Sequence, residues 1–115
     1  MEKLREIEFF RDIFLKFYIE LPKKVQIKYD YVFVIIRQAE FIPIKFFKKI
    51  TNQKNLYEIR VESESNIYRT FCCLDGMNVV VLFNSFKKKS QKTPSKELKR
   101  AIKLKNEYFD EKKEA

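Results

Sequence analysis

The feature that most constrains the fold is a change in the spacing of apolar residues part-way along the chain. Over Val25–Ile36 the apolar side chains recur at helical spacing. From Leu56 onward the spacing becomes two residues, which is typical of strands with one buried face. Helical spacing returns after Pro94. The chain is therefore predicted to be an α+β domain whose helices and sheet come from different segments.

The predicted order of elements is strand, two helices, three strands and a final helix. We expect the order β-α-α-β-β-β-α to form one domain over 1–115, with an antiparallel sheet and all helices packed on one of its faces. The predicted segments are a strand over Arg5–Phe10, helices over Arg11–Leu21 and Lys23–Glu40, strands over Leu56–Val61, Ile67–Leu74 and Val79–Phe86, and a last helix with Thr93 as N-cap, Pro94 at its first position and a frayed tail over 110–115.

Two segments are harder to assign. The centre of Lys23–Glu40, Tyr31–Ile36, is β-branched and aromatic, which favours a strand. Its helical stripe and its length favour a helix, and we predict a helix. Ile44–Ile50 follows Pro43 and is predicted to be a short turn or helix, with its three lysines forming a solvated rim.

The composition excludes several kinds of site. The chain has no histidine, so histidine-pair ribonuclease chemistry and zinc-water hydrolysis are excluded. With one glycine it has no glycine-rich nucleotide-binding loop. Cys72 and Cys73 are adjacent and should point to opposite faces of a strand as reduced thiols. We expect no metal and no cofactor. The absence of a leader or a long apolar run predicts a soluble, cytoplasmic protein.

Positive charge is concentrated near the C-terminal end. The segment Phe86–Lys105 contains nine lysine and arginine residues but one acidic residue, Glu97, and so carries +8 of the formal net charge of +9. A local field of this sign indicates a surface that binds a polyanion, and nucleic acid fits better than a membrane. The alternative is a solvated surface that binds nothing specific.

Strand alternation predicts which charges share a face of the sheet. We expect a four-residue loop over Glu62–Ser65, with Val61 opposite Asn66, and a two-residue turn at Asp75–Gly76, with Leu74 opposite Met77. One open face then carries Glu58, Arg60, Arg69 and Asn84, with Lys88 just beyond the strand, and the other carries Tyr57, Ile59, Val61, Tyr68, Val79, Val81 and Phe83. The first set forms a cationic pocket. The alternative is that Arg69 only pairs with Glu58 on the surface.

Three segments carry a combined motif: Leu56–Arg60, Asn66–Arg69 and Phe86–Pro94, followed by Glu97 and Ala101. Together they resemble the HigB-like toxins of the RelE superfamily, including their phage-derived branch, and the resemblance implies a RelE-like fold. The resemblance implies a type II toxin that cleaves messenger RNA, commonly on the translating ribosome, and that is partnered by a helix-turn-helix antitoxin. The positions that match those preserved in the family are Arg60, Arg69, Lys88, Lys89, Gln91, Lys92 and Thr93.

A metal-free mechanism follows as a hypothesis. The RNA 2′-hydroxyl would attack the scissile phosphate, and Arg60 and Arg69 would neutralise the phosphorane. Some relatives place a histidine or a C-terminal tyrosine near that phosphate, but this chain has no histidine, so the general base is open between Lys88, Lys89 and Glu58. RNA-binding roles are expected for Lys87, Gln91, Lys92, Thr93 and Asn84. The alternative functions are a non-catalytic basic nucleic-acid-binding module and an antitoxin-binding module.

Overall fold

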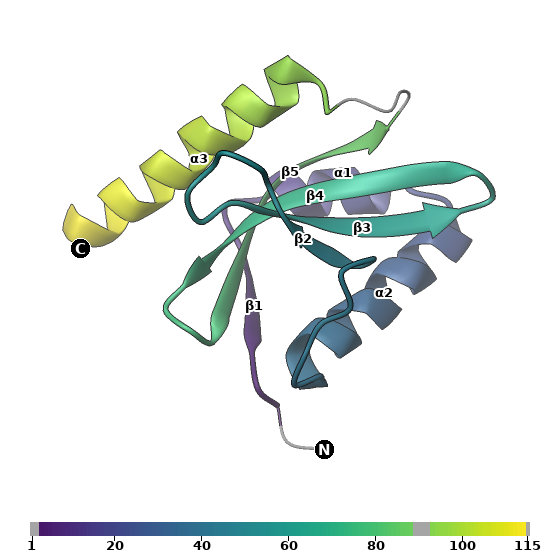
Figure 1. The fold of residues 1–115 in the computed structure, drawn as a ribbon. Helices are drawn as coiled ribbons and strands as arrows, with labels where there is room; N and C mark the ends of the chain where they lie inside the picture. The colour runs from purple at the N-terminus through teal and green to yellow at the C-terminus, as the bar shows by residue number, and fades with distance from the viewer. Residues whose placement is uncertain (1–2, 89–92, 115) are drawn as a thin grey trace.

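The computed structural model describes residues 3–88 and 93–114 and confirms the α+β class (Figure 1). The sheet has five strands in the order β1-β5-β4-β3-β2, and three helices pack on it. The elements in chain order are β1 Glu6–Phe9, α1 Ile13–Ile19, α2 Lys23–Gln38, β2 Phe47–Lys49, β3 Tyr57–Ser63, β4 Asn66–Asp75, β5 Val79–Lys88 and α3 Ser95–Glu114.

The sheet is mixed rather than antiparallel. β1 runs parallel to β5, with Glu6 opposite Val79, whereas the other neighbours are antiparallel. β2 was expected to be a turn or helix and is a strand, because the free edge of β3 offers it backbone partners. Phe47 also stacks on Tyr57, with 4.9 Å between ring centroids.

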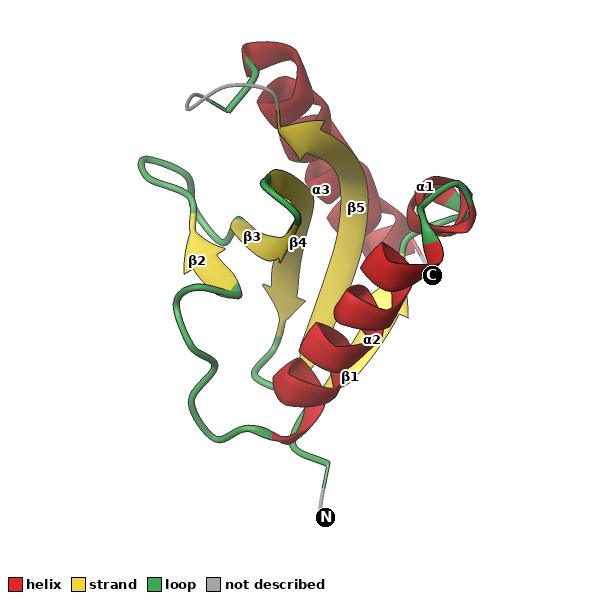
Figure 2. Ribbon diagram, turned by 90° about the vertical axis from the view of Figure 1, so that its right-hand side faces the viewer, coloured by secondary structure: helices red, strands yellow, loops and turns green. Residues whose placement is uncertain are grey.

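Helices cover both faces of the sheet, and the prediction of a single covered face is wrong. α1 and α2 pack on the face that carries Ile59, Tyr68 and Leu82 (Figure 2). α3 packs on the opposite face, against Phe71 and Phe83 among others. The physical reason is that α3 has its own apolar stripe, which needs a second apolar surface to bury it. Cys72 and Cys73 are free thiols and belong to the two different cores, as predicted.

The helix that was predicted over Lys23–Glu40 from its stripe of apolar residues is confirmed. α2 buries Val25, Tyr29, Val32 and Ile36 despite its β-branched centre, because tertiary burial of the stripe outweighs local propensity. α3 begins at Ser95, one residue later than expected: Leu98 N–H donates to the carbonyl oxygen of Pro94 at 3.1 Å.

The C-terminal end of α3 also differs from the expectation. α3 continues through Glu114, over most of the segment expected to fray. No helix within residues 3–88 and 93–114 is long and apolar enough to cross a membrane.

The β3–β4 hairpin has a tighter turn than predicted. Glu64 and Ser65 both have positive φ, 49° and 71°, which matches a two-residue turn whose twist suits the flanking strands. Arg60 therefore lies opposite Arg69, and the predicted pairing of Val61 with Asn66 is wrong by two residues. A shift of two residues leaves every side chain on its predicted face.

The β4–β5 hairpin departs from the prediction twice. Its turn has three residues, 76–78, so Leu74 pairs with Val80 rather than Met77. Further on, a bulge sets Phe83 and Asn84 together against Phe71. Val79, Val81 and Phe83 consequently face α3, on the side opposite to that predicted, and Arg69 faces Phe86 rather than Leu82.

Candidate functional site

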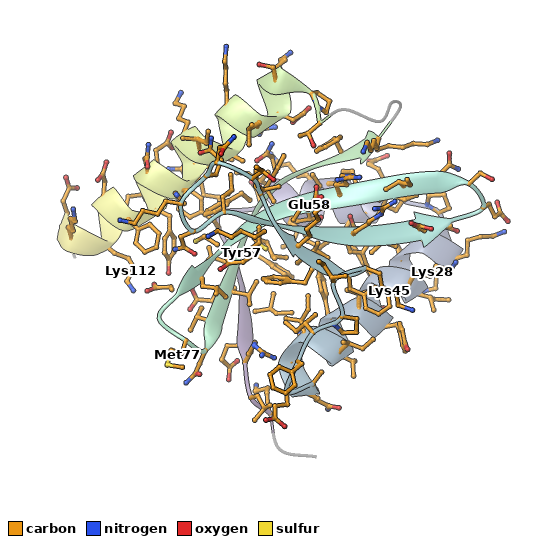
Figure 3. The ribbon with its side chains drawn as sticks, in the orientation of Figure 1. Lys28, Lys45, Tyr57, Glu58, Met77 and Lys112 are labelled. Carbon is orange, nitrogen blue, oxygen red and sulfur yellow. The ribbon has the colours of Figure 1, made fainter. Side chains whose placement is uncertain are left out.

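A polar cleft lies on the α3 face of the sheet, beyond the part that α3 covers. Its volume is about 400 Å³, and four strands or their ends contribute to its lining. Figure 3 places Glu58 on β3 at this position. The lining residues are Lys48, Lys49, Ile50, Thr51, Glu58, Arg60, Arg69, Lys88 and Thr93. Four of the five residues that define the predicted cationic pocket are therefore brought together.

A buried ion pair forms the floor of the cleft. Arg69 Nη1 donates to Glu58 Oε1, and the two side chains are 7% and 5% exposed. The ion-pair alternative was therefore right about the partners, but the pair is buried rather than on the surface. Arg69 Nε and Glu58 Oε2 have no hydrogen-bond partner among the described residues. The pair is thus incompletely satisfied, which is costly in a buried site and typical of functional positions.

Arg60 provides a second guanidinium on the same face. It lies directly opposite Arg69 across the β3–β4 ladder. Its Nη2 forms an ion pair with Glu62 Oε1 at 3.0 Å, its side chain is 34% exposed, and its Nε is buried with no partner among the described residues. Two cations on facing strand positions repel each other, so an anion bound between them would lower the energy of the site. A guanidinium fork matches two oxygens of one phosphate.

Lys88 closes the cleft from the end of β5. It is two residues beyond Phe86, which faces Arg69, so its side chain lies on the same face as the arginines. Burial lowers the pKa of the Lys88 amine, and the positive charges of Arg69, Arg60 and Lys48 lower it further, whereas Glu58 opposes the shift. The neutral amine is therefore more accessible to Lys88 than to an ordinary lysine, as a general base requires.

The other predicted site residues lie in different surroundings. Asn84 is fully buried and donates from Nδ2 to both the backbone oxygen and Oε1 of Glu97 at 3.0 Å, so it ties β5 to α3 and does not reach the cleft surface. Lys87 is exposed but faces the α2 side, opposite Tyr68. Thr93 lines the cleft. Lys89, Gln91 and Lys92 lie outside the described residues.

Sequence reasoning missed the contribution of β2. Lys48 was expected to lie on a solvated rim, but it pairs with Glu58 across β2–β3 and lines the cleft with Lys49 and Thr51. The signal for β2 in the sequence was the run of aromatic and lysine residues over Lys45–Lys49. Three residues are too few for alternation to identify a strand, so this signal was weak.

The cleft has one acidic residue in its lining, Glu58. Within residues 3–88 and 93–114, no three histidine, cysteine, aspartate or glutamate residues gather in a way that could hold a metal ion. Among the described residues, the charged groups that the cleft offers to a ligand are two guanidinium groups, three lysine amines and one carboxylate.

The family of this chain is identified by sequence comparison. The family described as "Phage derived protein Gp49-like (DUF891)" matches residues 16–106, which include every residue that lines the cleft. No curated protein matches the chain. The chain belongs to this Gp49-like, phage-derived family, which is RelE-like and toxin-like. The phage-derived and RelE-like parts of the resemblance are thus confirmed, and the assignment to HigB stays a prediction.

Proposed function

We propose that this member of the Gp49-like family is a HigB-like toxin of a type II toxin–antitoxin pair, and that it inhibits translation by cutting messenger RNA on the ribosome. One observation carries the proposal. Arg60 and Arg69 face each other across two strands, and Lys88 lies beside them in one cleft with a lowered pKa. This set supplies phosphate binding and a base at the same place.

In the proposed reaction the 2′-oxygen of the RNA attacks the neighbouring phosphorus. The neutral amine of Lys88 takes the 2′ proton, and Arg60 and Arg69 neutralise the charge that develops on the phosphorane oxygens. The bond to the 5′-oxygen breaks, and that oxygen leaves and takes up a proton. The products are a 2′,3′-cyclic phosphate and a 5′-hydroxyl, and the reaction needs no metal or cofactor.

Two other groups compete with Lys88 for the role of base. Glu58 Oε2 has no partner among the described residues, but Oε1 accepts from Arg69 Nη1, so the side chain is held in the ion pair on the floor of the cleft. Lys89, the next residue along, is the second competitor. Lys88 is preferred because it lines the cleft, where burial and the positive charge of Arg69 lower the pKa of its amine.

The proposed partner is a helix-turn-helix antitoxin, as the toxin-like family suggests. A second function is favoured by one observation. The buried Glu58 carboxylate lies against Arg69, where it would repel a phosphate. A non-catalytic module that binds nucleic acid or an antitoxin would tolerate this carboxylate, because it has no need to stabilise a dianionic transition state.

The test is induced expression in a bacterial host, with growth followed and messenger-RNA 5′ ends mapped. We expect wild type to arrest growth and to create new 5′ ends inside translated codons. Because loss of Arg69 also affects folding, Arg69→Ala is accompanied by Arg60→Gln, whose side chain is partly exposed. Removing one such donor costs about 10²–10³-fold in rate, so both variants should lose the cuts.

The matched control is Arg100→Gln, which removes the same charge from an exposed position of α3 outside the cleft. It should cut as wild type does. If folded wild-type protein makes no new 5′ ends, or if Arg60→Gln cuts as well as wild type, the catalytic function is wrong and the non-catalytic module is favoured.

A further inference from the structure

A second groove lies at the edge of the sheet, between α2 and β3. β2 pairs with β3 only as far as Ile59, so the rest of β3 borders this groove. Its volume is about 320 Å³. Figure 3 shows Lys28 of α2 and Lys45, which comes just before β2, at this edge of the molecule. The polar and aromatic residues that line the groove are Lys28, Tyr31, Lys45, Phe46, Arg60 and Glu62.

Two aromatic rings form one side of the groove. Tyr31 is 61% exposed and lies outside the buried stripe of α2. Its ring meets Phe46 edge to face, with 6.2 Å between centroids, and the Lys45 amine lies 4.9 Å from the centroid of Phe46. An exposed ring that a neighbouring ring supports is a platform on which a flat, unstacked nucleobase can lie.

The charge of the groove fits a nucleic acid. Among the described residues, three cations line it and Glu62 is the one acid. Glu62 Oε1 forms an ion pair with Arg60 at 3.0 Å, and the backbone oxygen of Glu62 accepts a hydrogen bond from Lys28 at 3.0 Å. The described lining of the groove therefore carries a net positive charge.

Arg60 connects the groove to the cleft, since it lines both. A phosphate held at Arg60 therefore has the scissile site on one side and the Tyr31 platform on the other. We propose that this groove binds an unstacked base of the single-stranded RNA, one that neighbours the phosphate held at Arg60 and stacks on Tyr31. The inference rests on the proposed function and assigns a base-binding subsite to it.

Binding of an RNA that cannot be cut tests the subsite directly. A short 2′-O-methyl oligonucleotide lacks the nucleophilic hydroxyl, so its affinity can be measured without turnover, by fluorescence anisotropy. Tyr31→Ala should bind about fivefold or more weakly, the lower end of the effect of losing one base stack. Tyr31→Phe keeps the ring and should bind as wild type does. Ile27→Ala is the matched control, one turn earlier on α2, 56% exposed and outside the groove.

An abasic oligonucleotide separates stacking from charge. Wild type and Tyr31→Ala should bind it equally, since the base that Tyr31 contacts is gone. In cells, Tyr31→Ala should still cut RNA, but with a weaker preference for the nucleotides that flank the cut. If Tyr31→Ala matches wild type in affinity and in flanking preference, the subsite is wrong while the proposed function stands.

If the wild-type protein itself does not cut RNA, the proposed function is wrong as well. A third outcome also contradicts the subsite: Tyr31→Ala binds RNA normally but loses affinity for an acidic peptide that contains phenylalanine. The groove would then be a protein docking site.

Discussion

The α3 face of the sheet has two ends that differ completely in character. At one end Phe71, Phe83 and Phe86 lie under α3 in a dry core. At the other, Arg60 and Arg69 line an open polar cleft. The same strands, β3 to β5, run through both ends. The difference shows that one sheet face can stabilise the fold along part of its length and hold charged side chains, with incompletely satisfied hydrogen bonds, along the rest.

Burial of side chains stabilises the fold at the apolar end and costs stability at the charged end. Each apolar side chain buried under α3 contributes about 1.5–3 kcal/mol relative to exposure. The Glu58–Arg69 pair loses hydration when it is buried, and Glu58 Oε2 and Arg69 Nε find no hydrogen bond among the described residues to offset that loss. The charged end is therefore expected to serve function at a cost in stability.

The largest expected effect is on the chemistry of the charged end. Lys88→Met removes the amine but keeps an unbranched side chain as long as the aliphatic part of lysine, and should lower the cleavage rate about 10²–10⁴-fold. Because the pKa of Lys88 is lowered, the wild-type rate should rise with pH and level off below the pH at which an ordinary lysine loses its proton. Single-turnover rates across the neutral and alkaline range measure both effects. A Lys88→Met protein with the wild-type rate and pH profile would exclude Lys88 as the base.

The next effect is on stability at the charged end. Arg69→Met leaves the buried Glu58 carboxylate without its partner, so the free energy of unfolding should fall by about 3–5 kcal/mol. The double variant Glu58→Leu/Arg69→Met replaces both charges with apolar groups and should recover most of this loss while remaining inactive. Urea denaturation measures the free energies. A loss below 1 kcal/mol in the single variant would mean that the pair behaves as an exposed one.

The smallest effect is at the apolar end. Leu104→Ala removes a buried side chain of α3 from the core and should lower the free energy of unfolding by about 2–3 kcal/mol. The cleavage rate per folded molecule should not change, because Leu104 lies outside the cleft. Arg100→Ala, exposed one turn earlier, should stay within about 0.5 kcal/mol of wild type. A change in rate for Leu104→Ala would show that the two ends are coupled.

The elements with long periodic patterns could be predicted from the sequence, and their pairing could not. α2 follows from a stripe that is longer than most strands, and β3, β4 and β5 follow from alternation. The parallel pairing of β1 with β5 leaves no local signal, since β1 has four residues and its partner lies far along the chain. β2 is shorter still.

The sheet face of each charged residue in the predicted pocket was predicted correctly, although the register on which that prediction rested was wrong in both hairpins. Turn lengths set the register, and the turn at Glu64–Ser65 needs two residues at positive φ that the sequence does not announce by a glycine. In β4–β5 the longer turn moved the apolar residues to the other face, and the bulge at Phe83–Asn84 moved the later ones back. The arginine-bearing end therefore agreed with prediction, whereas Val79 and Val81 did not.

The parallel pairing of β1 with β5 also has a consequence for synthesis. A ribosome that adds 5–20 residues per second takes about 4 to 15 s to make the chain between Glu6 and its partner Val79. During that interval the nascent α1 and α2 carry Phe14 and Tyr29 with no complete sheet to cover them. The cleft is finished later still, when Lys88 and Thr93 emerge. The protein therefore completes its charged site only after all five strands have been synthesised, with α3 still to follow.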